Sequence, residues 1–320
     1  MFLTTAGQID EHLKQAKKII IVPHPNPDGD ALGCASAMAE YLKSLGKDYT
    51  IFCATEPPRN LNFLKHCELV RTDEKCFSDP QIDTALLVDC GDLRYAGIAN
   101  FLTGKQFCVI NIDHHATNEH YGHFNLVVPE ASSASEVMYN FFKIAGARVN
   151  HDMATALLTG ILTDTDNFSN PATSASALNA GGELLRRGAN LRLINRQTLK
   201  NKNLNTLKIW GRALARLIKD EKRNMAYTYI TRADAEEYSV SDNDVGSIAN
   251  FLNNLEETEV FLLLKEDSEG NVKGSFRTTS DEIDVSLLAK KMGGGGHKKA
   301  AGFRTQGTIE ETLKQILTDE

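Results

Sequence analysis

The sequence has few of the features expected of an extracellular protein, a membrane protein or a protein that coats nucleic acid. Its six cysteines include no CxxC pair, which argues against a zinc–thiolate site. No apolar run approaches the roughly 20 residues that span a bilayer, and the first ten residues lack a basic segment followed by an apolar one. The formal net charge is −7, whereas proteins that bind long DNA usually present a basic face. We therefore expect a reduced, cytoplasmic protein that binds neither membranes nor long DNA.

The chain is long enough for more than one domain. Its 320 residues exceed what one hydrophobic core usually organises, and 42% hydrophobic residues are enough to fill two cores. In the first part, short apolar runs alternate with helical patterns, which predicts an α/β domain with a doubly wound, mainly parallel sheet. The expected strands are residues 17–22, 48–54, 83–89 and 109–112, with helices at 31–45 and 94–102.

The later segments change in character. After a short apolar piece at 124–128, helices are expected from Ser133, from His151 and over 173–187, and Ser133 with Glu136 has the spacing of a capping box. The last hundred residues predict a smaller α/β domain with a mixed sheet. Its expected elements are a strand at 225–230, a helix near 245–255, a hairpin at 260–265 and 272–278, and a helix at 284–292. We therefore predict domains at 1–190 and 220–320, joined by a helical linker at 191–219.

Polar groups follow the predicted strands of the first domain. The apolar run 109–112 ends directly in Asp113, His114 and His115. Because parallel strands end at one edge of a sheet, polar groups from other segments should gather at that edge. Several carboxylates packed together repel one another strongly unless they hold a cation, and an oxygen-rich set with imidazoles suits Mn²⁺ or Mg²⁺ better than structural Zn²⁺. The expected set is His24, Asp28, Asp30, Asp89, Asp113, His114, His115 and Asp164.

Alternatives stay open at three positions. Asp30 lies just before a predicted helix and could simply cap it. Asp28 follows Pro27 and could be an ordinary turn residue. Asp166 lies two residues after Asp164 and competes with it for the same metal.

A second unusual stretch lies near the end of the chain, where four glycines (293–296) precede His297 and Lys298. Four consecutive glycines cost conformational entropy, so a close backbone approach or positive φ angles should justify them. We expect Gly294, Gly295 and Gly296 to face an anion as a backbone nest, and a flexible hinge is the alternative. Arg277, His297 and Lys298 would add phosphate-binding groups, although Lys298 could equally lie on a solvated face.

These segments together resemble a known family, the DHH phosphoesterases. The resemblance rests on Asp113-His114-His115, His24-Pro25-Asn26-Pro27-Asp28-Gly29-Asp30, Val88-Asp89 and Thr163-Asp164-Thr165. The glycine run with His297 resembles the DHH-associated carboxyl-terminal domain, and the GGGGH segment and the length resemble the nano-RNase and pAp phosphatase branch.

The resemblance implies a site with two Mn²⁺ ions, with Mg²⁺ as the other candidate. It assigns His24 and Asp28 to one ion, Asp89 to both, and Asp30, His114 and Asp164 to the second. A hydroxide that bridges the ions would then be the nucleophile. Alternation along a strand turns His115 away from His114, so His115 is our candidate to bind the phosphoryl group or protonate the leaving oxygen. Asp113 could accept the free N–H of a ligating histidine.

We therefore predict a metal-dependent hydrolase for short oligoribonucleotides, cut from an end, and for the 3′-phosphate of pAp. The second domain should hold a distal phosphate of the substrate. A homodimer is the one protein–protein association that we consider. Aromatic residues make up only 7% of the chain, and Phe168 is the candidate for stacking on a base. The alternatives are action on polyphosphate, pyrophosphate or a cyclic dinucleotide and, with lower weight, a nucleotide sensor without turnover.

Overall fold

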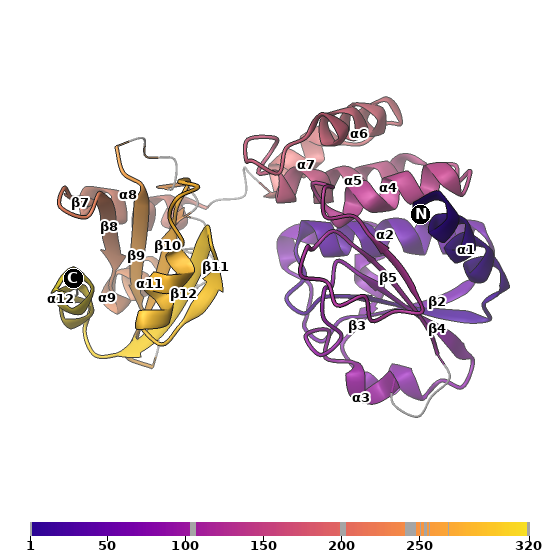
Figure 1. Ribbon diagram of the computed structural model, residues 1–320, viewed down its shortest axis with the longest axis horizontal. Coiled ribbons are helices and arrows are strands. Elements are labelled where there is room, and N and C mark those ends of the chain that lie inside the picture. The colour runs from indigo at the N-terminus through magenta and orange to yellow at the C-terminus, as the bar shows by residue number, and fades with distance from the viewer. Residues whose placement is uncertain are drawn as a thin grey trace. The chain divides into compact units, whose positions relative to one another are not determined.

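A computed structural model describes residues 2–102, 107–198, 203–240, 248–249, 251–252, 255, 257–267 and 269–318. The chain divides into two compact units, Met1–Asn201 and Lys202–Glu320, and each is described by itself (Figure 1). All six cysteines are free thiols. None of the helices within the described ranges is both long and apolar enough to cross a bilayer.

The first unit is built on a six-stranded sheet in which every pairing is parallel. Its strand order is β3-β2-β1-β4-β5-β6, so the prediction of a doubly wound parallel sheet is confirmed. The order reverses between the neighbours β1 and β4, and ligands of such sheets bind at the carboxyl ends of the strands beside that reversal. The strands are β1 (Lys18–Pro23), β2 (Asp48–Phe52), β3 (Val70–Arg71), β4 (Ile82–Val88), β5 (Cys108–Asp113) and β6 (Phe124–Val127).

The two faces of this sheet bury alternate residues of the same strands. Ile19 and Ile21 pack into one core, and Ile20 and Val22 into the other. Figure 1 shows α2, α4 and α5 on one side of the sheet and the short α3 (Ala99–Leu102) on the other. The helices of the larger core are α1 (Phe2–Gln15), α2 (Gly29–Ser44), α4 (Ala134–Ile144), α5 (His151–Asp164), α6 (Ala175–Arg186) and α7 (Leu191–Thr198).

Helices α2 and α5 approach each other closely because glycines line their contact. A Cβ atom at Gly29 would lie 2.5 Å from Oγ1 of Thr163, and one at Gly33 would lie 2.5 Å from the carbonyl oxygen of Ala156. A Cβ at Gly160 would overlap the carboxylate of Asp30. This packing brings the first turn of α2 beside the last turns of α5.

Some predicted helices differ from those in the structure. The helix expected at 94–102 is limited to α3, and α1 was not predicted. The stretch 191–219 contains two helices, α7 and α8 (Leu204–Ala215), in different units. Ser133 caps α4 through its side chain as expected, but the Glu136 side chain accepts from the amide of Ser132, one residue before the cap. The helix expected near 245–255 lies largely outside the described residues.

The second unit has a six-stranded mixed sheet of order β11-β12-β10-β9-β8-β7, which confirms the predicted class. Strands β8 and β9 pair in parallel, and the other pairings of the described strands are antiparallel. The strands are β7 (Ile218–Asp220), β8 (Met225–Ile230), β9 (Val260–Glu266), β10 (Asn271–Arg277), β11 (Gly295–His297) and β12 (Ala300–Gln306). Helix α8 belongs to this unit, together with α9 (Arg232–Tyr238), α11 (Val285–Lys291) and α12 (Ile309–Thr318).

The glycine run of the second unit (293–296) leads into the edge strand β11, which begins at Gly295. Two of its members have no room for a side chain. A Cβ at Gly294 would overlap the carbonyl oxygen of Gly302, and one at Gly296 would lie 2.6 Å from Cα of Ala301. Close packing against β12 therefore accounts for glycine at these two positions, independently of any ligand.

Candidate metal centre

Seven of the side chains expected at the sheet edge come together where β1, β4 and β5 end. His24 follows β1, Asp89 follows β4, and His114 and His115 follow β5. The other three are Asp28 and Asp30 at the start of α2 and Asp164 at the end of α5. Asp89 has a left-handed backbone, with φ of 54°, which is uncommon outside glycine and concentrates at functional sites.

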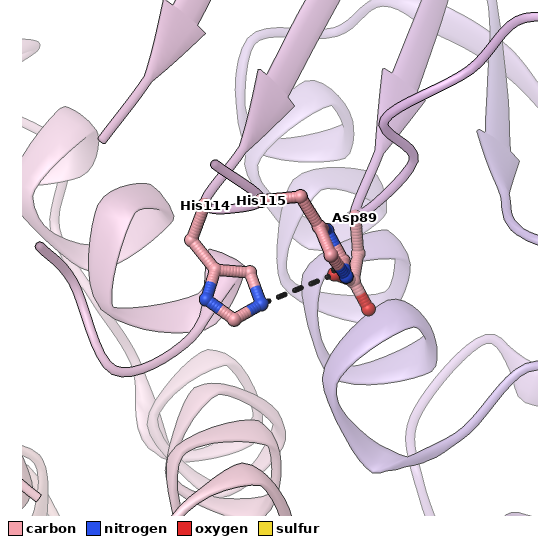
Figure 2. A group of neighbouring side chains, drawn as sticks. All are labelled: Asp89, His114 and His115. Carbon is pink, nitrogen blue, oxygen red and sulfur yellow. Dashed lines mark ion pairs between the residues drawn. The ribbon is translucent and has the colours of Figure 1, made fainter. Parts of the chain in front are cut away.

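Asp89 lies between two groups of potential metal ligands. Its Oδ2 atom is 3.4 Å from Nε2 of His24, and its Oδ1 atom is 3.7 Å from Nε2 of His114. Figure 2 shows His114 and His115 on one side of the Asp89 carboxylate. On the first side Asp28 joins His24, with Oδ1 3.7 Å from Nε2. On the second side Oδ2 of Asp164 lies 3.3 Å from Nε2 of His114, and Asp30 completes the group.

These distances fit a divalent cation better than direct hydrogen bonds. Two ligand atoms that each lie about 2.1 Å from one ion are at most about 4.2 Å apart. The Asp89 contacts at 3.4 and 3.7 Å meet that limit. Asp89 is only 3% exposed, and its Oδ1 atom has no hydrogen-bond partner. A buried carboxylate oxygen without a partner is costly, and a cation would satisfy it.

A backbone carbonyl oxygen orients the imidazole ring of His24, and another orients that of His114. Nδ1 of His24 lies 2.8 Å from the carbonyl oxygen of Pro25, and Nδ1 of His114 lies 3.4 Å from that of Ala131. A hydrogen bond from Nδ1–H to a carbonyl leaves the lone pair on Nε2. In both residues Nε2 is the atom that faces the carboxylates.

The electrostatics of the cluster also favour a cation. Burial, together with repulsion from Asp30, Asp89 and Asp28, raises the pKa of Asp164 to about 10. Burial opposes the charged form of His24, but the neighbouring carboxylates of Asp28 and Asp89 prevail and raise its pKa to about 12. The cluster therefore retains protons that a divalent ion would displace.

The structure assigns the helix-cap role, which the sequence suggested for Asp30, to Asp28. Asp28 is the N-cap of α2, since its Oδ1 accepts from the amides of Asp30 and Ala31 at 3.0 and 3.1 Å. The proposal that Asp30 caps this helix is wrong, because Asp30 lies inside its first turn. Its carboxylate instead accepts from the amides of Ala134 and Ser135 at the start of α4, at 2.6 and 2.8 Å. These contacts attach the first turn of α2 to α4.

Asp113 is paired with His115 rather than with His114. Its Oδ1 atom lies 2.8 Å from Nδ1 of His115, and the completely buried carboxylate also accepts from Asn118. The hydrogen bond and charge of Asp113 raise the pKa of His115, although burial opposes this. We expected Asp113 to accept from the ring of a metal-ligating histidine. Its side chain instead holds His115, whereas the ring of His114 faces the carbonyl oxygen of Ala131. Sequence reasoning missed Asn118, which no motif marks.

Asp164 and Asp166 differ in their surroundings. Asp164 belongs to a potential metal-binding group, whereas Asp166 is exposed and belongs to none of those found among the described residues. Residues 166–168 all have left-handed backbones, which turns the chain sharply after α5. The turn directs the Phe168 ring onto α6, where a Cβ at Gly181 would lie 2.8 Å from Cζ. Phe168 thus packs against the larger core and is partly buried, and its expected role as a base-stacking residue stays a prediction.

In the second unit, strand register brings the expected phosphate-binding residues into one row. Arg277 of β10 lies opposite Ala300 of β12, and Ala300 lies opposite His297 of β11. Residues directly opposite on neighbouring strands share a face of the sheet. The small side chain of Ala300 therefore separates Arg277 from His297 on that face, and Lys298 follows as an exposed residue.

The fold and the site together define a metal-dependent hydrolase. Residues 18–161 match the family model described as DHH family, N-terminal domain, and residues 222–319 match the DHHA1 domain. The chain belongs to the DHH family of metal-dependent phosphoesterases, which confirms the family and the enzyme class indicated by its motifs.

Individual relatives agree with this assignment. The chain is 29% identical over 309 residues to the bifunctional oligoribonuclease and PAP phosphatase NrnA of Thermus thermophilus, covering 93% of this chain and 88% of that protein. An exopolyphosphatase-related protein from Bacteroides fragilis has a similar fold, with a TM-score of 0.91 at 24% identity, covering 98% of this chain and 95% of the other. RecJ of Thermus thermophilus, solved in complex with Mn²⁺, gives a TM-score of 0.57 at 18% identity, covering 99% of this chain and 54% of RecJ.

Proposed function

We propose that this enzyme hydrolyses short oligoribonucleotides from an end and the 3′-phosphate of pAp, with two Mn²⁺ ions at the candidate metal centre. The observation that supports two ions is the position of Asp89, whose two oxygens face separate histidines, His24 and His114. The similarity to the NrnA oligoribonuclease over 93% of the chain supports the choice of substrate.

In this proposal His24 and Asp28 would hold one ion, Asp30, His114 and Asp164 would hold the other, and Asp89 would be a ligand to both. When bound, the ions would activate a water for in-line attack and neutralise charge on the phosphoryl oxygens. The carbonyl oxygens of Pro25 and Ala131 orient the two imidazoles, and the start of α4 fixes Asp30.

His115 is the residue that we propose to act on the substrate itself. It is half-exposed, with 44% of its side chain accessible, and Asp113 holds its Nδ1 atom. The hydrogen bond and charge of Asp113 raise the pKa of His115, which favours the protonated imidazole, and Nε2–H can then donate to the phosphoryl group or to the leaving oxygen. The proton moves from Nε2 of His115 to the ester oxygen as the bond breaks.

We also propose that the second unit supplies phosphate-binding groups. Arg277 and His297 share one sheet face, and the exposed Lys298 follows His297 in the chain. Gly295 and Gly296 would contribute backbone amides to the same anion. The amide of Gly294, which was expected to join them, donates instead to the carbonyl oxygen of Ala289 at 2.8 Å. A guanidinium can bind phosphate through two parallel hydrogen bonds.

Product analysis tests the choice of substrate. The full-length protein with Mn²⁺ is incubated with a labelled triribonucleotide, with pAp and with tripolyphosphate. We expect mononucleotide from the first, AMP from the second and slower phosphate release from the third. Hydrolysis of tripolyphosphate without any trinucleotide cleavage would contradict the proposed oligoribonuclease activity and favour the polyphosphate alternative. Nucleotide binding without turnover, even with saturating Mn²⁺, would favour a sensor.

A further inference from the structure

The first unit presents one aromatic side chain to solvent. Among its described residues Tyr95 is the single exposed aromatic, with 58% of its surface accessible. The other Phe and Tyr side chains described in this unit are buried or partly buried. An isolated exposed aromatic is common on protein surfaces, so its neighbours decide whether Tyr95 has a function.

The backbone holds Tyr95 in its exposed position. Oδ1 of Asp92 accepts from the amide of Arg94 at 2.7 Å, and the amide of Ala96 donates to the carbonyl oxygen of Asp92 at 3.2 Å. Gly97 closes this turn with φ of 73°. The residues on either side of the turn's end, Ala96 and Ile98, are buried in the core. The backbone hydrogen bonds of Arg94 and Ala96 therefore hold the chain on both sides of Tyr95, whose side chain is exposed.

Tyr95 contacts the candidate metal centre. Its ring centroid lies 6.2 Å from that of His24, with the planes inclined by 32°. The His24 ring is itself held by the carbonyl oxygen of Pro25, and its Nε2 atom lies 3.4 Å from Asp89. His24 therefore contacts both the Tyr95 ring and the carboxylate of Asp89, which links the two groups of potential metal ligands.

We infer that Tyr95 is a stacking surface for the base of the nucleotide whose phosphate lies at the metal centre. The inference rests on the proposed function and extends it to a base-binding site. Every nucleobase has a π-face, so one aromatic ring can serve substrates of any sequence. A polyphosphate has no planar group for such a surface. Phe168, the aromatic first considered for this role, is turned onto α6 and partly buried, whereas Tyr95 is exposed.

A binding comparison isolates the base from the phosphate. Calorimetry with the Mn²⁺-loaded, full-length protein measures the affinity for AMP and for ribose 5-phosphate, which differ by the base alone. We expect Tyr95→Leu to weaken AMP binding roughly five- to 150-fold, the range for loss of one stacked base. Ribose 5-phosphate should bind equally well to both proteins, and Tyr95→Phe should retain the affinity for AMP. Leu69→Ala, an exposed apolar position of the same unit, is the control and should change neither affinity.

The other outcomes separate this inference from the proposed function. An unchanged AMP affinity in Tyr95→Leu, or no preference of the unmodified protein for AMP over ribose 5-phosphate, overturns the base-binding site. Equal weakening of both ligands also overturns it, because Tyr95 would then act through the position of His24. The proposed function fails by a different result, the absence of trinucleotide and pAp hydrolysis, and the AMP comparison still decides the role of Tyr95 in that case.

Discussion

The buried carboxylate of Asp113 lies 2.8 Å from Nδ1 of His115, and His115 itself lies beside Asp89 and His114 in a third group of potential metal ligands. The two consecutive histidines therefore have different proposed roles, metal binding for His114 and substrate binding for His115. His114 faces Asp164, while His115 keeps Nε2 for a substrate.

Replacing His115 with glutamine should therefore impair turnover rather than metal binding. We expect kcat to fall by about 10²-fold or more, the usual contribution of a general acid, while Mn²⁺ stoichiometry stays unchanged. His151→Gln is the matched control, since His151 is also exposed and also lies beside an aspartate, Asp152, at 3.1 Å. Steady-state kinetics and metal analysis check both variants. A loss of Mn²⁺ in His115→Gln would show that His115 is a ligand.

Asp164 and Asp166 provide a paired test of the metal centre. Asp164→Asn should weaken Mn²⁺ binding and activity by about 100-fold or more, because loss of even a supporting partner of a ligand costs 10- to 100-fold. Asp166→Asn should stay near the unmodified protein, since Asp166 is exposed and asparagine tolerates its left-handed backbone. Calorimetric titration with Mn²⁺ measures both affinities. The opposite ranking would assign Asp166 to the metal.

Gly160 should be needed for the position of Asp30. An added Cβ would overlap Asp30 and Ser135, so Gly160→Ala should destabilise the protein by about 1–3 kcal/mol through overpacking and should also weaken Mn²⁺ binding. Gly182→Ala in α6 is the control. Its Cβ would meet nothing closer than 4.0 Å, so the substitution should stabilise the helix by about 1 kcal/mol. Denaturant unfolding and Mn²⁺ titration compare the two. Equal stability of both variants would contradict the packing argument.

How much of this arrangement the sequence could predict depends on whether a feature is local. The apolar runs that end in Asp89 and Asp113 are local, and they predict parallel strands with polar groups at one edge. The pairing of Asp113 with His115 was not predictable, because it depends on how the chain turns after β5. Gly294 and Gly296 likewise depend on β12, which approaches them from across a hairpin. Helix α1 was missed although it was predictable, because Ala6, Ile9 and Leu13 recur at the i, i+3, i+7 spacing of one helix face.

Asp234 should make the second unit sensitive to acid. Burial opposes its ionisation, but hydrogen bonds from Arg216, Thr231 and Arg212 prevail and hold the pKa of Asp234 well below its usual range. A depressed folded-state pKa stabilises the protein above the unfolded value of about 4, and that contribution is lost as the pH falls below it. Asp234→Asn should therefore lower the unfolding free energy at pH 7 by about 1–3 kcal/mol and flatten its decline between pH 4 and pH 2.

Denaturant unfolding at several pH values checks this prediction. Asp281→Asn is the control, because Asp281 is a highly exposed residue whose pair with Lys299 should contribute less than about 1 kcal/mol. If Asp234→Asn retained the full acid sensitivity of the unmodified protein, other carboxylates would be responsible for it.

The groups around Asp89 come from the ends of β1, β4, β5 and α5, which lie between residue 24 and residue 164 of the chain. A divalent ion held among them would tether four segments that have no reason to meet in the unfolded chain. Loading the centre should accordingly act as a reversible cross-link, and by mass action the melting temperature of the first unit should rise with the free Mn²⁺ concentration. The second unit, which contains none of these side chains, should melt at a temperature that does not respond to the metal.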